Sequence, residues 1–199
     1  MIKELIPKNR SYRRFHQERA VTMGTLRELI DLARLAPSGY NRQGLKYLLS
    51  NSGDLNNKIN DCLSWAGYLQ DWNSPPEGEK PAAFIIMVRD TSLGASLPQD
   101  QGFAAQSILL GAVEKGLGGC FLVNINKRML GEVLNLDKSY DIEAVIAIGY
   151  PKEKVVLEEI DASGDVRYWR DDEQVHHVPK RTLEEIILPI PGLKSRLNV

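Results

Sequence analysis

An uninterrupted apolar run stands near the middle of the sequence: Ala82-Ala83-Phe84-Ile85-Ile86-Met87-Val88. Such a run is typical of a strand that is buried on both faces. Residues 142–148 form a second run of this kind, and shorter strands are expected at residues 45–50 and 119–123. Strands without a polar face need helices on both sides of their sheet. The pattern therefore predicts a helix-covered sheet, and it leaves open whether the strands are parallel or antiparallel.

Helices are expected between these strands. The first long helix starts at Thr22 or Thr25, because Thr25 and Glu28 have the spacing of a capping box. Pro37 ends it, because the residue before a proline is pushed away from helical angles. Residues 100–115 are apolar around nearly the whole helix, which indicates burial in a core or an interface.

The pattern changes after Pro151. Residues 155–161 and 166–171 flank a turn-forming segment, so we expect a hairpin there. We interpret residues 1–199 as a single domain with this hairpin as an insertion at about 152–178. The last residues, 188–199, are expected to extend along a surface.

Global composition excludes several classes of function. The chain has 199 residues, 43% of them hydrophobic, and a net charge of -1, so nothing global attracts nucleic acid or an anionic membrane. No apolar run approaches the roughly 20 residues of a membrane span, and the expected location is cytoplasmic. Cys62 and Cys120 are expected to be reduced, buried thiols. No Cys and His spacing indicates a metal site.

The familiar catalytic and nucleotide motifs are missing, among them GxGxxG, the P-loop, HExxH and GxSxG. The segment Arg10-Ser11-Tyr12-Arg13-Arg14 is basic, and two arginines with a hydroxyl between them can converge on a phosphate. Lys180-Arg181 is a second small basic spot. The alternative for both is a solvated surface charge.

Two further segments suit a ligand. Gly39 allows close approach of the backbone, and Asn41 and Gln43 add amide side chains. Gly118 and Gly119 stand between a buried helix and a buried strand, where backbone N–H groups can face a planar ligand. The alternatives are a plain helix-ending turn for the first segment and simple C-capping for the second.

In this order, the segments resemble the nitroreductase family of FMN-dependent oxidoreductases, from about Ile6 to Ile187. The matching stretches are residues 10–15, 36–43, 102–110, 115–120 and 148–151, and the basic pair before Thr182-Leu183-Glu184-Glu185. The resemblance implies an α+β fold, with helices around a mainly antiparallel central sheet. It also implies a homodimer with FMN at the dimer interface, where the helix at residues 100–115 packs.

The resemblance assigns site residues by position. Arg10, Ser11 and Arg13 would hold the phosphate and ribityl chain, and Lys180 and Arg181 would complete the phosphate site. The partner subunit would contribute the residues that line the ring and the ribityl chain: Pro37, Ser38, Gly39 and Asn41, with Gln43 nearby. Gly118 and Gly119 would bring backbone amides to the ring system. No protein residue is expected to be catalytic, because the flavin carries the chemistry.

The implied activity is that of an enzyme. We expect an NAD(P)H-driven, ping-pong reduction of nitroaromatics, quinones or similar small-molecule electrophiles, by hydride transfer through flavin N5. One alternative is another chemistry on the same cofactor, such as dehalogenation, substrate oxidation or flavin reduction. The other is a dimer that binds a flavin or nucleotide without turnover.

Overall fold

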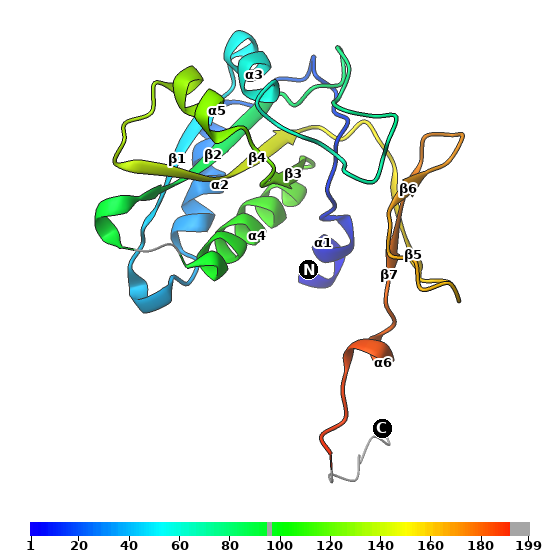
Figure 1. Ribbon diagram of the computed structural model, residues 1–199. Coiled ribbons are helices and arrows are strands. Elements are labelled where there is room, and N and C mark those ends of the chain that lie inside the picture. The colour runs from blue at the N-terminus through cyan, green and yellow to red at the C-terminus, as the bar shows by residue number, and fades with distance from the viewer. Residues whose placement is uncertain (95–96, 192–199) are drawn as a thin grey trace. The chain divides into compact units, whose positions relative to one another are not determined.

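A four-stranded sheet lies at the centre of the first of two compact units, Met1–Glu153 and Lys154–Val199 (Figure 1). The computed structural model describes residues 1–94 and 97–191. All neighbouring strands of this sheet are antiparallel. In spatial order they are β1 (Leu45–Ser50), β2 (Ala83–Asp90), β4 (Tyr140–Gly149) and β3 (Gly118–Leu122). The predicted strands are thus confirmed, and so is the antiparallel sheet that the resemblance implied.

The two inner strands, β2 and β4, carry the apolar runs. Ile85 lies opposite Ile146, and Met87 lies opposite Ala144. These side chains are fully buried, and so is Phe84 on the opposite face of the sheet. Because successive residues of a strand point to opposite faces, both faces must be covered.

Helices cover both faces of this sheet (Figure 1). On one face lie α2 (Met23–Arg34) and α4 (Pro98–Glu114), which pack against each other and contribute Leu26, Leu29 and Ile108 to the main core. The other face carries α3 (Gly53–Asn60) and α5 (Lys127–Leu134), and α1 (Ile2–Lys8) packs against α4. Within residues 1–94 and 97–191, no helix is long and apolar enough to cross a membrane.

The ends of α2 and α4 correct some details of the expected helices. Thr22 is the N-cap of α2, and its hydroxyl accepts the Thr25 N–H at 3.0 Å. The capping box at Thr25 and Glu28 is therefore wrong, because Thr25 already lies inside the first turn. α4 is followed by Gly116 at a φ of +72°, a backbone conformation that favours glycine. Phe103 on α4 is 48% exposed, so this chain covers only part of the helix.

The second unit contains a small sheet with the order β5-β7-β6 and a short helix, α6 (Leu183–Ile186). β5 (Val155–Glu159) pairs in parallel with β7 (His176–Lys180), and β6 (Trp169–Arg170) pairs with β7 in antiparallel fashion.

The predicted pairing of residues 155–161 with 166–171 is therefore wrong, because β7 lies between these segments. The Trp169 ring stacks on the His177 ring at 4.1 Å, and this cross-strand pair favours the observed register. Most of the predicted extended tail, residues 192–199, lies outside the described residues.

The burial of α4 against the sheet gives a stability prediction. Replacing Ile108 with Ala removes a fully buried side chain, so the free energy of unfolding should fall by about 2–5 kcal/mol, against about 0.5–1.5 kcal/mol for Ile108→Val. Urea denaturation followed by circular dichroism measures both. The control is Gly131→Ala in α5, where an added Cβ meets nothing within 4 Å; the same assay should show a gain of about 0.5–1 kcal/mol. Equal effects for the two Ile108 variants would contradict this core position.

Candidate functional site

The basic segment near the N-terminus lies along the free edge of β3. Ser11 forms a parallel bridge with Gly119, and the Tyr12 N–H donates to the Gly119 carbonyl oxygen at 3.0 Å. Phe15 forms an antiparallel bridge with Pro151 just beyond β4. Two motifs that are far apart in the sequence, the basic segment and the glycine pair, therefore meet at one edge of the sheet.

Gly118 and Gly119 are explained by close packing at this edge. A Cβ on Gly118 would lie 2.4 Å from the Tyr12 ring and 2.7 Å from Pro151. A Cβ on Gly119 would lie 2.6 Å from the Ala147 carbonyl oxygen. The C-capping alternative for this pair is wrong, because Gly116 has the left-handed conformation after α4 and both glycines belong to β3. The absent side chains also leave this stretch of backbone uncovered by side chains of its own.

The guanidinium group of Arg10 has only some of its hydrogen-bond donors paired among the described residues. Its Nη2 donates to the Ile6 carbonyl oxygen at 2.8 Å. Its Nε is buried and has no hydrogen-bond partner among the described residues. Partial burial lowers the pKa of Arg10 from its usual value. A buried guanidinium N–H without an acceptor is costly, so an anion at this point would be stabilised.

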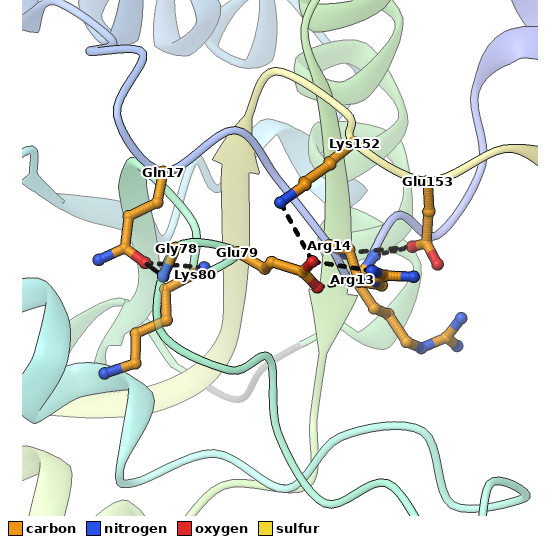
Figure 2. Close-up of polar contacts among 8 residues, drawn as sticks. All are labelled: Arg13, Arg14, Gln17, Gly78, Glu79, Lys80, Lys152 and Glu153. Atoms are coloured by element: carbon orange, nitrogen blue, oxygen red, sulfur yellow. Dashed lines mark hydrogen bonds and ion pairs between the residues drawn. The ribbon is translucent and has the colours of Figure 1, made fainter. Parts of the chain in front are cut away.

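Arg13 and Arg14 differ in what their side chains contact. Arg13 is buried, and its Nη1 donates to the Ser11 carbonyl oxygen at 3.1 Å. Arg14 donates from Nε and Nη2 to the buried carboxylate of Glu79. Figure 2 shows Glu79 held on its other side by Lys152, at 3.2 Å. Arg14 is thus engaged in an ion pair with Glu79.

The Glu79 carboxylate is strongly stabilised in its charged form. The hydrogen bonds from Arg14 contribute most, and Lys152 adds to them, so the pKa of Glu79 falls to about 2. Burial acts in the opposite direction and is outweighed. Next to it, the Gln17 side chain accepts the N–H groups of Gly78 and Lys80, at 2.8 and 3.1 Å (Figure 2). The turn that carries Glu79 is therefore held firmly beside the basic segment.

The loop after α2 is held by Asp100, in the first turn of α4. One carboxylate oxygen accepts the Ser38 hydroxyl and the other accepts the Gly39 N–H, both at 2.8 Å. The Ser38 hydroxyl oxygen accepts the Gln43 N–H at 3.0 Å. A Cβ on Gly39 would lie 2.2 Å from a methyl group of Leu97, so the loop approaches the start of α4 as closely as a glycine allows.

The same loop contains several residues in the left-handed region. Tyr40, Asn41 and Gln43 have φ angles of 53°, 53° and 51°. Such angles cost energy in residues with a side chain and cluster at functional sites. A groove of about 790 Å³ runs beside the loop and is lined by Pro37, Ser38 and Gln43, among others. The helix-ending turn is therefore a tightly held loop at a groove, rather than a plain turn.

The two candidate clusters lie at opposite ends of α4. Ser38 and Gly39 contact Asp100 near its first residue, whereas Gly118 and Gly119 follow its last turn. α4 runs from Pro98 to Glu114, so at about 1.5 Å per residue it is about 25 Å long. One chain therefore brings Ser11 together with the glycine pair, but it does not bring the Ser38 loop to them.

Lys180 and Arg181 belong to the second unit. Lys180 is the last residue of β7, and its carbonyl oxygen accepts the Ile160 N–H at 3.0 Å. Arg181 contacts Glu185 of α6 at 3.5 Å. Both side chains are exposed. In the small sheet, Lys180 lies opposite Glu159 of β5. The role of Lys180 and Arg181 at a phosphate site stays a prediction.

The cysteines are buried and free. Burial raises the pKa of both thiols, that of Cys120 to about 11. Both are therefore protonated, and unreactive, at neutral pH. Within residues 1–94 and 97–191, no group of three or more His, Cys, Asp or Glu side chains is arranged to hold a metal ion.

Comparison with known families gives a match that lies within the first unit. The model described as "Nitroreductase family" matches residues 6–67 and 77–150. The chain belongs to the nitroreductase family. This match contains Arg10, Ser11, Arg13, the loop at 37–43 and the glycine pair, and it ends before Lys180 and Arg181.

Several relatives agree with this family. The Bacillus subtilis (strain 168) protein named "Putative NAD(P)H nitroreductase MhqN" is 25% identical over 180 residues, which cover 74% of this chain and 87% of that protein. The structure of an FMN-dependent nitroreductase from Clostridium difficile R20291 has a TM-score of 0.63 at 24% identity, covering 77% of this chain and 89% of that chain. An FMN complex from Desulfovibrio desulfuricans has a TM-score of 0.68 at 22% identity and covers 96% of each chain. These structural likenesses show a shared nitroreductase fold.

Three acidic residues beside the candidate site were missed in the sequence. Asp100, Glu79 and Glu153 each hold a segment far away along the chain. Only Asp100 had a local signal, since an acidic residue in the first turn of a helix favours the positive end of the helix dipole. Glu79 and Glu153 lie in irregular segments, and no spacing in the sequence links them to the arginines.

The depressed pKa of Glu79 gives a prediction for acid stability. Its pKa is about 2 in the folded chain against an unfolded value of 4.5, so its contribution is complete above pH 4.5 and is lost as the pH falls toward 2. Glu79→Gln should therefore be less stable than the wild type at pH 7, with the difference shrinking toward pH 2. Urea midpoints measured from pH 7 to pH 2 test this. The control is Asp71→Asn, an exposed residue whose carboxylate makes no hydrogen bond or ion pair with the described residues, so its curve should follow the wild type. A constant gap for Glu79→Gln across this range would refute the assignment.

Proposed function

We propose that this chain is an FMN-dependent oxidoreductase that takes electrons from NAD(P)H and reduces nitroaromatics, quinones or similar electrophiles. Family membership supports this, since a relative is named as an NAD(P)H nitroreductase and another as an FMN-dependent nitroreductase. The observation that carries the proposal is the meeting of the basic segment with the glycine pair at the free edge of β3. A cationic segment beside two glycines, which have no side chains, suits a ligand that has a phosphate at one end and a flat ring at the other.

The donors at this edge fit the phosphate of FMN. Arg10 has a buried Nε without an acceptor among the described residues, Ser11 offers a hydroxyl, and the buried Arg13 adds a second guanidinium. Charge-assisted hydrogen bonds of this kind are among the stronger contacts in proteins. When bound, FMN supplies hydride chemistry, and this chain has only to bind and orient the cofactor and to exclude competing reactions.

Two copies of the chain would complete the site. The loop with Pro37, Ser38, Gly39, Asn41 and Gln43 lies at the opposite end of α4 from the glycine pair, about 25 Å away along the helix. In a symmetric pair that packs α4 against α4 in antiparallel fashion, the loop of one copy would approach the glycines of the other. The exposed Phe103 on α4 supports an interface there. Lys180 and Arg181 are included in the proposed phosphate site on the resemblance alone.

The proposed cofactor gives a direct test. Purified wild-type protein should show a flavin spectrum that is bleached by NADH or NADPH under anaerobic conditions. Arg10→Ala removes a charge-assisted phosphate contact worth about 1.5–3 kcal/mol, so the Kd for FMN should rise about tenfold or more. Quenching of flavin fluorescence on titration measures this Kd.

The matched control is Arg128→Ala, which removes an exposed arginine of α5 that pairs with Glu132. Its FMN affinity should equal that of the wild type. A colourless wild-type protein that takes up no FMN would refute the function. A bound flavin that neither nicotinamide reduces would favour a binding protein without turnover.

The proposed pairing predicts the mass in solution. Light scattering after size exclusion should give twice the chain mass of 22.3 kDa. Phe103→Glu places a charge on the exposed face of α4 and should shift the protein to monomers, with loss of bound FMN but with an unchanged circular dichroism spectrum. Tyr68→Glu alters another exposed aromatic residue away from α4 and should leave the dimer intact. A monomeric wild type with full FMN affinity would contradict the shared site.

A further inference from the structure

Glu153 is a buried acid directly behind the basic segment. It follows the end of β4, and its Oε1 accepts the backbone N–H groups of both Arg13 and Arg14, the latter at 3.2 Å. Figure 2 shows the carboxylate reaching these two consecutive residues. A charged acceptor makes stronger hydrogen bonds to backbone N–H groups than a neutral one does. One side chain therefore holds the backbone of two consecutive residues of the basic segment.

Neighbouring hydrogen bonds strengthen this attachment. The Lys152 N–H donates to the Arg14 carbonyl oxygen at 2.9 Å, so each of the segments 13–14 and 152–153 both donates to the other and accepts from it. On the other side, the Tyr12 N–H is bound to Gly119. The backbone is thus attached at three consecutive residues, Tyr12, Arg13 and Arg14, directly after Ser11. This stretch has little freedom to adjust to a ligand.

We propose that Glu153 is a positioning residue for the phosphate end of the cofactor, holding the backbone of Arg13 and Arg14 so that the donors of the basic segment are set before the ligand binds. This inference rests on the proposed function and extends it to a residue that makes no contact with the ligand. Donors that are already ordered avoid the entropy cost of ordering on binding, and affinity rises accordingly.

The negative charge of Glu153 would by itself repel a phosphate. The two ways in which Glu153 could act therefore predict opposite changes in FMN affinity. If Glu153 acted through its field alone, removing it would strengthen FMN binding. If it acts by holding the backbone, removing it weakens FMN binding in spite of the lost repulsion. The amide of Gln keeps an oxygen acceptor without the charge, so Glu153→Gln separates the two effects.

The test compares FMN with riboflavin, which has the same ring and ribityl chain but no phosphate. A general loss of structure weakens both ligands equally, whereas misplaced phosphate donors weaken FMN alone. We expect Glu153→Ala to raise the Kd for FMN about tenfold or more and to change that for riboflavin by less than about twofold. Glu153→Gln should remain within about threefold of the wild type for both ligands. Fluorescence quenching provides all of these values.

The matched control is Glu143→Ala, which removes another partly buried, ion-paired carboxylate of the first unit, bound to Arg89 and Gln101. The ratio of the FMN and riboflavin Kd values should not change in this variant. If Glu153→Ala does not fold, Glu153→Asp takes its place, because the shorter side chain withdraws the carboxylate and should raise the ratio of the FMN Kd to the riboflavin Kd.

The other outcomes overturn the inference. Tighter FMN binding by both Glu153→Ala and Glu153→Gln would mean that the field alone matters. An equal weakening of both ligands, or an unchanged ratio in a folded Glu153→Asp, would leave Glu153 with a purely structural role. A wild type that binds neither flavin, or binds both equally, refutes the proposed cofactor site itself, and this result is visible before any variant is made.

Discussion

The burial of β2 and β4 on both faces is the constraint from which the rest of the structure follows. Side chains such as Phe84, Ile85 and Ile146 have no contact with water, so each face of the sheet must be covered by helices. α2 and α4 cover one face, and α3 and α5 cover the other. No polar ligand can reach the middle of such a sheet. A ligand site is therefore expected at an edge of the sheet or in the loops around it.

At the β3 edge, close packing explains both glycines of the strand. Gly118 and Gly119 lack side chains because Tyr12, Pro151 and the Ala147 carbonyl leave no room for a Cβ. The same lack lets Ser11 come within bridging distance of the strand. The packing of these glycines is therefore compatible with a role in ligand binding. The basic segment lies against the strand because no side chain at these two positions separates them.

Local signals predicted most of the elements. The apolar runs marked β2 and β4, and Pro37 stands just beyond the helix that it was expected to end. The failure at β5, β6 and β7 has a physical reason: a parallel pair such as β5 with β7 depends on contacts distant in sequence, while the turn between the expected hairpin strands is a local feature.

The site was predictable only in part, for a similar reason. The candidate donors were visible because Arg10, Ser11 and Arg13 are neighbours in the sequence. Glu153, which accepts from the Arg13 backbone, and Glu79, which pairs with Arg14, come next to them only in the folded chain. Asp100 likewise reaches the Ser38 loop only once α2 and α4 have packed. Partners of this kind carry no spacing that a reader of the sequence could recognise.

The acids around the basic segment also reduce its electrostatic potential at a distance. Glu79 is charged down to a pH of about 2 and, with Glu153, lies within the same small volume as Arg13, Arg14 and Lys152. The two carboxylates offset two of these three positive charges, and what remains is screened beyond a Debye length, which is about 8 Å at physiological ionic strength. The segment therefore attracts a distant anion less than its arginines alone would. The association rate of an anionic ligand would accordingly depend less on salt than the number of arginines suggests.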